Sequence, residues 1–313
     1  MKEIVVLSGK GGTGKTTVTS SLVPYLSGAV LADCDVDAPD LDVLFSSRKV
    51  STEEFVGGKK AFSVCSFESG GTGTGIGDSL ESPKLSDSAE TVCDGCGLCV
   101  RHCKFNALHL TSDGIAVNED RCEGCGVCVH LCPESALRLR NSAAGHLHVS
   151  DHVYGAMVHA RLYPGEENSG RLVHAVRQKA RSIANEKSAP FILSDGSPGI
   201  GCSVMSSLTG NNLAILVTEP SRSAFHDLKR IHELVRNFSI PAVAVINKFT
   251  LNDVLTREIE DYCRTESLEV GFRLPFSLEI PRALTQGQVP SLALPELFEE
   301  HGFSQFVSGI ADR

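Results

Sequence analysis

Short runs of apolar residues, most of them followed by glycine or polar residues, recur along this 313-residue chain. Runs of about four to eight such residues are typical of strands buried on both faces of a parallel sheet. Between the last two runs, apolar residues recur at helical spacing from Phe225 to Phe238, which predicts an amphipathic helix. The pattern therefore predicts an α/β fold with a doubly wound, mostly parallel sheet. The predicted strands are Ile4–Leu7, Ala29–Ala32, Phe191–Asp195, Leu213–Val217 and Ala242–Ile246.

The first of these runs leads into a glycine-rich loop that is followed by a helical pattern. A strand, a glycine loop and a helix in this order form the context that a P-loop requires. Glycines let successive backbone N–H groups converge on phosphate oxygens, and the start of the helix favours negative charge. We therefore predict a site for ATP and Mg²⁺, in which Lys15 reaches the β and γ phosphates and Thr16 binds the metal. The loop residues expected at this site are Gly9, Lys10, Gly11, Gly12, Thr13, Gly14, Lys15 and Thr16.

Acidic residues follow two of the other predicted strands. The segment after Ala29–Ala32 has aspartates at positions 33, 35, 37 and 40, which are costly to crowd together unless a cation or a water network uses them. Plain surface acidity is the alternative for this segment. The run Phe191–Ser194 ends in Asp195, an arrangement typical of the Walker B aspartate that holds Mg²⁺ through water. The glycine-rich turn that follows, 196–201, is suited to sensing the γ-phosphate.

The P-loop contains a second lysine, Lys10, from which the chain reads Lys-Gly-Gly-Thr-Gly-Lys-Thr. This segment resembles the deviant Walker A motif of the MinD, ParA, Mrp and nitrogenase iron protein superfamily. The resemblance implies that Lys10 reaches the nucleotide of an opposite subunit, so that a homodimer forms through the ATP interface. It also implies catalytic roles for Lys10, Lys15 and Asp35, with Asp35 orienting the attacking water.

The same resemblance implies three further contacts and one departure. Asp33 is expected near Mg²⁺, Asn247 against the adenine, and Pro275 in the loop that covers the base. Members of the superfamily usually carry a second proline where Ser197 stands. The stiffness of this turn is therefore left open.

The twelve cysteines form the second candidate site. Eight of them fall in two copies of the pattern Cys-x2-Cys-x2-Cys-x3-Cys, which is typical of two [4Fe–4S] clusters. Because the fourth cysteine of each run binds the other cluster, the first cluster is expected on Cys93, Cys96, Cys99 and Cys132. The second is expected on Cys103, Cys122, Cys125 and Cys128. Zinc is the alternative, which the third cysteine at the same interval and the repeat disfavour.

The cysteine segment resembles a bacterial two-cluster ferredoxin over about 50 residues. One departure is Lys104, which stands where a proline usually follows the fourth cysteine. We expect a P-loop ATPase domain interrupted by an α+β ferredoxin domain. The expected domains are 1–90, the first part of the ATPase with a Gly/Ser-rich linker at about 66–90, then 91–145, the ferredoxin domain, and 146–313, the second part of the ATPase.

Charge and hydropathy bear on the partners. Lysine and arginine number 29 and aspartate and glutamate 38, a net charge of −9 that gives no support to nucleic-acid or anionic-membrane binding. No run approaches the roughly 20 apolar residues of a spanning helix or the apolar core of a secretion signal. A cytoplasmic protein is expected. The predicted function is ATP-gated electron transfer from the two clusters to an unidentified redox partner. The alternative is a carrier that delivers Fe–S clusters to an acceptor protein.

Three other features are weaker candidates. Cys202 has the spacing from Asp195 of a cysteine that binds an inter-subunit cluster in the nitrogenase iron protein, but no second cysteine lies near 165–170. The polar segment 159–170 resembles a segment characteristic of MinD-type ATPases with inserted ferredoxin domains, and a helix start is the alternative. His146, His148 and His152 are close enough in sequence to gather, although metal binding there is disfavoured.

Overall fold

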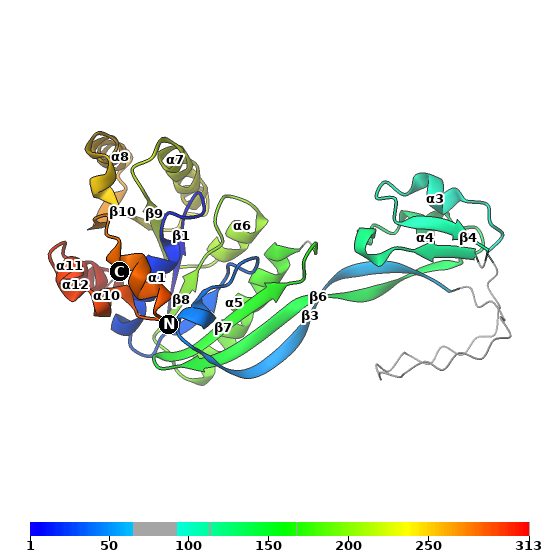
Figure 1. Ribbon diagram of the computed structural model, residues 1–313, viewed down its shortest axis with the longest axis horizontal. Coiled ribbons are helices and arrows are strands. Elements are labelled where there is room, and N and C mark those ends of the chain that lie inside the picture. Colours follow the sequence, from blue (N-terminus) through cyan, green and yellow to red (C-terminus); the bar gives the residue numbers. More distant parts are fainter. Residues whose placement is uncertain (65–92, 113, 167, 313) are drawn as a thin grey trace. The chain divides into compact units, whose positions relative to one another are not determined.

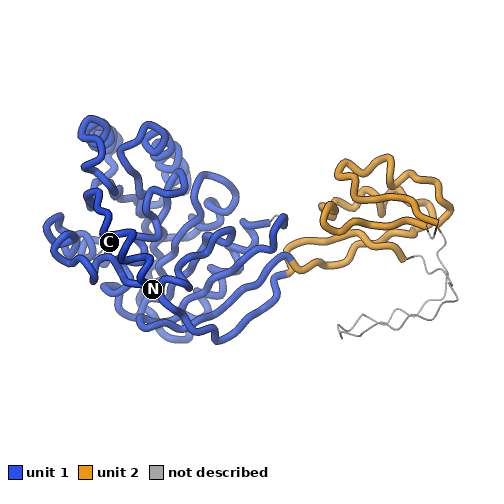
Figure 2. Tube along the Cα trace, viewed as in Figure 1, with its two compact units in different colours: residues 1–55, 144–313 blue, residues 56–143 orange. Residues whose placement is uncertain are grey.

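The computed structural model describes residues 1–64, 93–112, 114–166 and 168–312. The chain divides into two compact units, of which the first contains residues 1–55 and 144–313 and the second residues 56–143 (Figure 2). The predicted linker at about 66–90, and Cys65, lie outside the described residues. Among the described residues, no helix is long and apolar enough to cross a membrane.

The larger sheet has nine strands within the described residues (Figure 1). These are β1 (Lys2–Leu7), β2 (Val30–Asp33), β3 (Arg48–Ser63), β6 (Leu137–His152), β7 (Gly155–Leu162), β8 (Phe191–Asp195), β9 (Leu213–Thr218), β10 (Ala242–Asn247) and β11 (Glu269–Leu274). Their order is β11-β10-β9-β1-β8-β2-β7-β6-β3. The strands from β11 to β7 are joined by parallel pairing, whereas β6 pairs with β7 antiparallel. The prediction of a mostly parallel sheet is confirmed.

Helices cover both faces of this sheet because successive residues of a strand point to opposite sides. Ile4 and Val6 of β1 pack with Leu22 and the C-terminal aromatic residues, whereas Val5 and Leu7 join the core on the other face. One face carries α1 (Lys15–Leu22), the 3-10 helix η1 (Val23–Tyr25), α2 (Leu41–Leu44), α9 (Glu279–Thr285), α10 (Pro290–Ala293), α11 (Pro295–Glu299) and α12 (Phe303–Asp312). The other carries α5 (Ser169–Glu186), α6 (Cys202–Leu208), α7 (Arg222–Asn237), the 3-10 helix η3 (Phe249–Leu251) and α8 (Asp253–Thr265).

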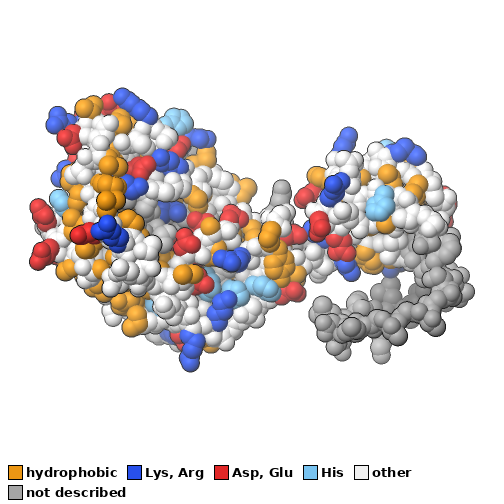
Figure 3. Space-filling model, viewed as in Figure 1, with side chains coloured by type: hydrophobic (Ala, Val, Ile, Leu, Met, Phe, Trp, Pro, Cys, Tyr) orange, Lys and Arg blue, Asp and Glu red, His pale blue; other side chains and the backbone are white. Residues whose placement is uncertain are grey.

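The register of the central strands brings their acidic ends together. In the ladder, Val6 is paired with Asp195 and Asp195 with Asp33. The carboxyl ends of β1, β8 and β2 therefore meet at one edge of the sheet, where ligands of open α/β sheets bind. On the face shown in Figure 3, acidic and basic side chains are interspersed over this unit.

The second unit is built around the cysteine motifs. It contains α3 (Leu98–His102), β4 (Leu108–Thr111), β5 (Gly114–Val117), the 3-10 helix η2 (Glu119–Arg121) and α4 (Val127–Leu131), with β4 and β5 paired antiparallel. Parts of β3 and β6 complete it. Its small core combines apolar side chains such as Leu108, Ile115 and Leu137 with the sulfur atoms of Cys99, Cys122 and Cys128.

Candidate functional site

The glycine loop joins β1 to α1 and lies against the end of β10. The Asn247 side chain is buried and its Nδ2 donates a hydrogen bond to the Thr13 carbonyl (2.8 Å). Gly14, with φ of 98°, precedes the helix, and a Cβ atom there would lie 2.1 Å from Asn247 Nδ2. Only glycine fits this combination of left-handed backbone and close approach. Asn247 therefore holds the loop in shape.

Asp195 lies beside the start of α1. Its carboxylate accepts hydrogen bonds from Thr16 Oγ1 (2.8 Å) and Thr19 Oγ1 (2.9 Å). The side chain is 2% exposed, and burial raises the pKa of Asp195 although Lys15 and the two hydroxyl groups oppose the rise. The predicted Walker B aspartate and the predicted P-loop threonine are thus in direct contact.

Asp33 and Asp35 extend this acidic edge. Asp33 is buried and accepts hydrogen bonds from the N–H groups of Asp35 (3.1 Å) and Leu41 (3.3 Å). Burial and then the charge of Asp195 raise the pKa of Asp33 well above its usual range. The Lys15 ammonium lies 3.7 Å from Asp35 Oδ2. Two buried carboxylates whose pKa values are raised, next to a threonine hydroxyl, form a donor set that fits a hard divalent cation such as Mg²⁺.

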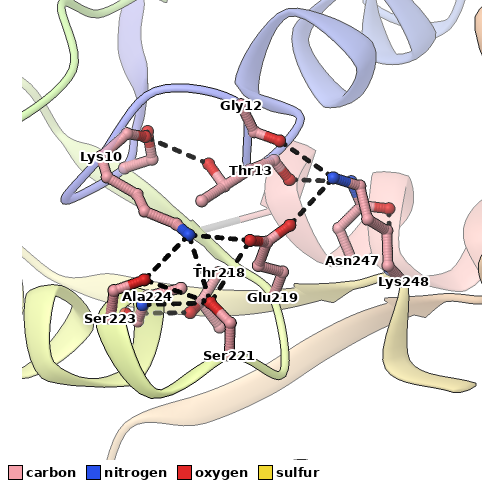
Figure 4. A network of polar contacts seen from close by, with 11 residues as sticks. Lys10, Gly12, Thr13, Thr218, Glu219, Ser221, Ser223, Ala224, Asn247 and Lys248 are labelled. Carbon is pink, nitrogen blue, oxygen red and sulfur yellow. Dashed lines mark hydrogen bonds and ion pairs between the residues drawn. The ribbon is translucent and has the colours of Figure 1, made fainter. Parts of the chain in front are cut away.

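Lys10 lies in a polar network with Glu219, Ser221 and Ser223 (Figure 4). Its Nζ is 2.9 Å from Oε1 of Glu219 and within hydrogen-bond distance of the hydroxyl groups of Ser221 and Ser223 (3.2 and 3.1 Å). Lys248 Nζ lies 2.8 Å from the other Glu219 oxygen. Burial opposes the ionisation of Glu219, but these two lysines outweigh it and lower the pKa of Glu219.

A pocket opens beside the glycine loop, between the ends of β10 and β11. It is lined by Gly12, Asn247, Pro275, Phe276 and Ile280, among others, and has a volume of about 290 Å³. Mainly apolar walls with a few polar side chains, here Asn247 and Lys248 among them, suit a flat heteroaromatic base. Asn247 and Pro275, which the sequence assigned to adenine, therefore line the same pocket.

Two loops at the site edge are joined by a hydrogen bond. Ser197 Oγ donates to the Cys34 carbonyl (2.6 Å), and the Gly199 N–H donates to the Ser8 carbonyl (3.0 Å). The serine that replaces the expected proline thus ties the turn after β8 to the aspartate segment after β2.

Burial raises the pKa of the Cys34 thiol to about 12, which makes it an inert packing residue.

Cys202 is exposed at the start of α6 and lines a wide pocket with residues from the start of α5. A Cβ atom on Gly170 would lie 3.2 Å from the Cβ atom of Cys202, so the residue closest to Cys202 at the start of α5 is a glycine. An inter-subunit cluster on Cys202 therefore has no second ligand at this position. Asn168 precedes α5 without a side-chain capping bond.

In the second unit, all four cysteines of one predicted set, and three of the other, lie near one another. Cys103, Cys122, Cys125 and Cys128 line a single pocket. Burial raises the pKa of Cys99, and Cys132 and Cys93 lie near enough to raise it further. Backbone N–H groups of Ala107, Ala136 and Ala61 donate to the sulfur atoms of Cys103, Cys132 and Cys122 at 3.3–3.4 Å. Each group thus combines cysteine sulfur with amide donors.

Within the described residues, no three His, Cys, Asp or Glu side chains converge as ligands of a single ion would. The four thiolates of a cubane bind four different iron atoms and stand apart around the cluster. The finding therefore concerns sites for a single metal ion and does not test a cluster site. Four thiols around one pocket, with amide N–H groups on the sulfur atoms, fit an iron–sulfur cluster.

The histidines of β6 and β7 form a group in the first unit. His146 and His148 are both on β6, and His148 is paired across the ladder with His159 of β7. His159 therefore belongs to a strand, where its side chain is 2% exposed, and the polar segment begins only after Leu162. His152 stacks on Phe45 instead of joining the other three.

Comparison with known proteins assigns the family. The family described as the CobQ/CobB/MinD/ParA nucleotide binding domain matches residues 4–290. The chain belongs to this MinD/ParA family. Its members are ATPases, so the chain is a nucleotide-binding ATPase of the MinD/ParA type.

Relatives of this MinD/ParA protein include two uncharacterized proteins of Methanocaldococcus jannaschii. MJ0578 is 27% identical over 285 residues, which cover 90% of this chain and 87% of the relative. MJ0579 is 24% identical over 287 residues, which cover 85% and 91%.

Solved structures of MinD and related proteins share the fold. MinD of Pyrococcus horikoshii complexed with Mg-ADP has a TM-score of 0.51 at 15% identity, with 98% of this chain and 93% of that chain covered. A McdA variant of Cyanothece complexed with ATP has a TM-score of 0.52 at 14% identity, with 100% and 95% covered. The MinC:MinD complex of Aquifex aeolicus gives 0.51 at 15% identity, with 100% and 95% covered.

Glu219 is the site residue that the sequence did not predict. It follows β9 directly, as Asp33 and Asp195 end their own strands. The rule that acidic residues at the carboxyl ends of parallel strands belong to the site would have found it. Lys248, which directly follows β10 at the same edge of the sheet, was not assigned to the site either.

Proposed function

We propose that this MinD/ParA-type ATPase carries two [4Fe–4S] clusters in its inserted unit and uses ATP to gate electron transfer from them to a partner protein. The observation that carries the proposal is the pocket lined by Cys103, Cys122, Cys125 and Cys128. Those are the four residues that the repeat assigns to one cluster, and they come from both copies of the motif. The other cluster would be held by Cys93, Cys96, Cys99 and Cys132.

The residues of the first unit would divide the work at ATP. Lys15 and the backbone N–H groups of residues 9–14 would bind phosphate oxygens, while Thr16 and Asp195, with Asp33 behind them, would hold Mg²⁺. Asp35, 3.7 Å from Lys15, would orient the attacking water. Asn247 and Pro275 would contact the adenine. A homodimer formed through the ATP interface, with Lys10 contributed to the opposite subunit, belongs to the same proposal.

When bound, each cluster supplies a centre that accepts and releases one electron. The protein tunes such a centre through N–H donors on the sulfur atoms and through exclusion of water. The amides of Ala61, Ala107 and Ala136 would donate to the sulfur atoms. The apolar side chains around Leu108 and Leu137 would exclude water. The Ser197–Cys34 hydrogen bond joins the two loops next to ATP, so a change at one loop would reach the other.

The test is an anaerobic redox titration of the reconstituted protein. Cluster potentials are read by electron paramagnetic resonance with and without MgATP, and electron release is followed with a viologen dye as acceptor. We expect MgATP to shift a cluster potential or the rate of dye reduction in the wild type. A Lys15→Ala variant should keep its iron and lose the response, because it removes the phosphate contact and leaves the cysteines untouched.

The carrier alternative gives the opposite pattern. If MgATP leaves potentials and dye reduction unchanged while clusters move to an apo-ferredoxin acceptor, the electron-transfer proposal is wrong and delivery replaces it. Absence of iron from protein reconstituted under these conditions would overturn both.

A further inference from the structure

We propose that Glu219 is a positioning residue that stores Lys10 on its own subunit, and that Lys248 holds Glu219 in place when Lys10 leaves. The proposal deepens the proposed function, because it rests on Lys10 moving to a phosphate of the opposite subunit. Lys10 must first break its contact with Glu219.

All the donors of the Lys10 ammonium are engaged within its own chain. An ammonium has three N–H donors. In the structure Lys10 Nζ has three acceptors: Glu219 Oε1 at 2.9 Å, Ser223 Oγ at 3.1 Å and Ser221 Oγ at 3.2 Å (Figure 4). Lys10 cannot bind a phosphate in trans without leaving these acceptors. The contact with Glu219 therefore competes with the dimer.

The cost of leaving depends on what remains at Glu219. Its side chain is 15% exposed, and a buried carboxylate without a counter-charge is strongly disfavoured. Lys248 Nζ stays 2.8 Å from Oε2, so Glu219 remains paired after Lys10 has gone. Lys248 also donates to the Gly12 carbonyl (2.9 Å), which fixes it to the glycine loop. Lys248 thus allows the contact between Lys10 and Glu219 to break and form again.

This arrangement predicts effects of opposite sign. Glu219→Gln removes the charge that holds Lys10, so Lys10 should be freer. Lys248→Met removes the second cation, which leaves Glu219 with Lys10 alone, so Lys10 should be held more tightly. If the network only maintained the structure of the loop, both variants would change the reactivity of Lys10 in the same direction.

The experiment measures the reactivity of the Lys10 amine in the nucleotide-free full-length protein. Trace acylation with acetic anhydride is quantified at Lys10 by mass spectrometry, relative to exposed lysines of the same chain. We expect about two- to fivefold faster labelling in Glu219→Gln, as for loss of a partly exposed ion pair, and slower labelling in Lys248→Met. Glu219→Asp keeps the charge and should restore most of the protection of Lys10 from acylation. This variant keeps the test decisive if Glu219→Gln misfolds.

Glu258→Gln is the matched control, since it removes another ion-paired carboxylate, 2.7 Å from Arg222, on the exposed surface. It should leave Lys10 labelling unchanged. Equal labelling of wild type and Glu219→Gln, or a shift of Glu219→Gln and Lys248→Met in the same direction, would overturn the storage role.

A second readout separates this inference from the proposed dimer. Dimer formation with Mg²⁺ and a non-hydrolysable ATP analogue is followed by sedimentation velocity. The analogue concentration at half-maximal dimer should fall about two- to fivefold in Glu219→Gln. If labelling behaves as expected and no variant forms a dimer, the storage contact stands and the ATP-bridged dimer of the proposed function fails.

Discussion

Gly14 and Asn247 pack so closely that a Cβ atom on Gly14 would lie 2.1 Å from the Asn247 amide nitrogen. Gly14→Ala should therefore displace either the glycine loop or the end of β10, in addition to straining a backbone with φ of 98°. We expect a loss of about 2 kcal/mol in the free energy of unfolding and at least about tenfold weaker binding of ATP. Urea unfolding and titration with a fluorescent ATP analogue measure the two effects.

Gly11 provides the control for stability, because a Cβ atom there meets no other atom within 4 Å. Gly11→Ala should unfold at the wild-type urea concentration. Equal stability of Gly14→Ala and Gly11→Ala would contradict the packing argument.

Asp195→Asn should separate stability from catalysis. Asp195 is paired with Asp33 in the ladder, and burial raises the pKa of both carboxyl groups. Removing one charge should stabilise the metal-free protein by about 1 kcal/mol and slow ATP hydrolysis at least about a hundredfold. Thermal unfolding without Mg²⁺ and a phosphate-release assay test this. Thr19→Val, which removes only a hydrogen bond to Asp195, should lower the melting temperature instead.

A buried ion pair joins the start of β1 to α5 and α6. Arg177 is 3% exposed, lies 2.8 Å from Glu3 Oε2 and donates to the Ser206 carbonyl (2.8 Å). Arg177→Met leaves the Glu3 carboxylate with Arg181 alone and should cost about 3 kcal/mol of unfolding free energy. Lys179→Met, on the same helix but in an exposed pair with Glu53, should cost less than about 1 kcal/mol. Similar unfolding midpoints for the two variants would exclude the buried pair as a major contribution.

Acid should destabilise the protein through His152. Burial lowers the pKa of His152 from 6.5 to about 4, so the folded state keeps the ring neutral while the unfolded state binds a proton. This contribution is fully present above pH 6.5 and is lost as the pH falls towards 4. His152→Phe keeps the stacking on Phe45 and removes the titration, so its unfolding free energy should fall less between these two pH values. His226→Gln, at an exposed histidine, should show the wild-type slope.

The inserted unit offers a glycine pair for testing cluster assembly. A Cβ atom on Gly124 would lie 1.9 Å from the Lys59 carbonyl oxygen, whereas one on Gly95 meets nothing within 4 Å, although both have positive φ. Gly124→Ala should push Cys122 and Cys125 out of position and reduce reconstituted iron from about eight to about four atoms per chain. Gly95→Ala should keep nearly full iron. A colorimetric iron assay decides, and full iron in Gly124→Ala would contradict the predicted ligand set.

Local patterns were sufficient for the sheet and the glycine loop. The strands β1, β8, β9 and β10 were predicted to within two residues, since a strand buried on both faces is a continuous apolar run that needs no knowledge of its neighbours. Thr16 could be placed in advance because the P-loop motif specifies strand, loop and helix, and Asp195 because it ends an apolar run, as a Walker B aspartate does.

Contacts between distant segments were beyond the sequence. Glu219 meets Lys10 because β9 is the neighbour of β1 in the sheet, and strand order is not encoded in periodicity. The segment that begins at His159 reads as polar, yet the His159 side chain is buried and contacts Asp42 and, on β6, Ser150. The core of the second unit also includes Ala61 of β3, whose N–H donates to Cys122, although no local pattern marks Ala61 as a partner of the cysteines.

The strands that lead into and out of the second unit, β3 and β6, are consecutive in the order of the sheet. Residues 56–143 therefore stand where a simple hairpin turn would otherwise join two neighbouring strands. Such a connection allows the whole unit to be inserted or removed at one point of the chain without reordering any other strand. A chain in which a short Asn-Gly turn replaces residues 56–143 offers a route to the ATPase as an independent protein.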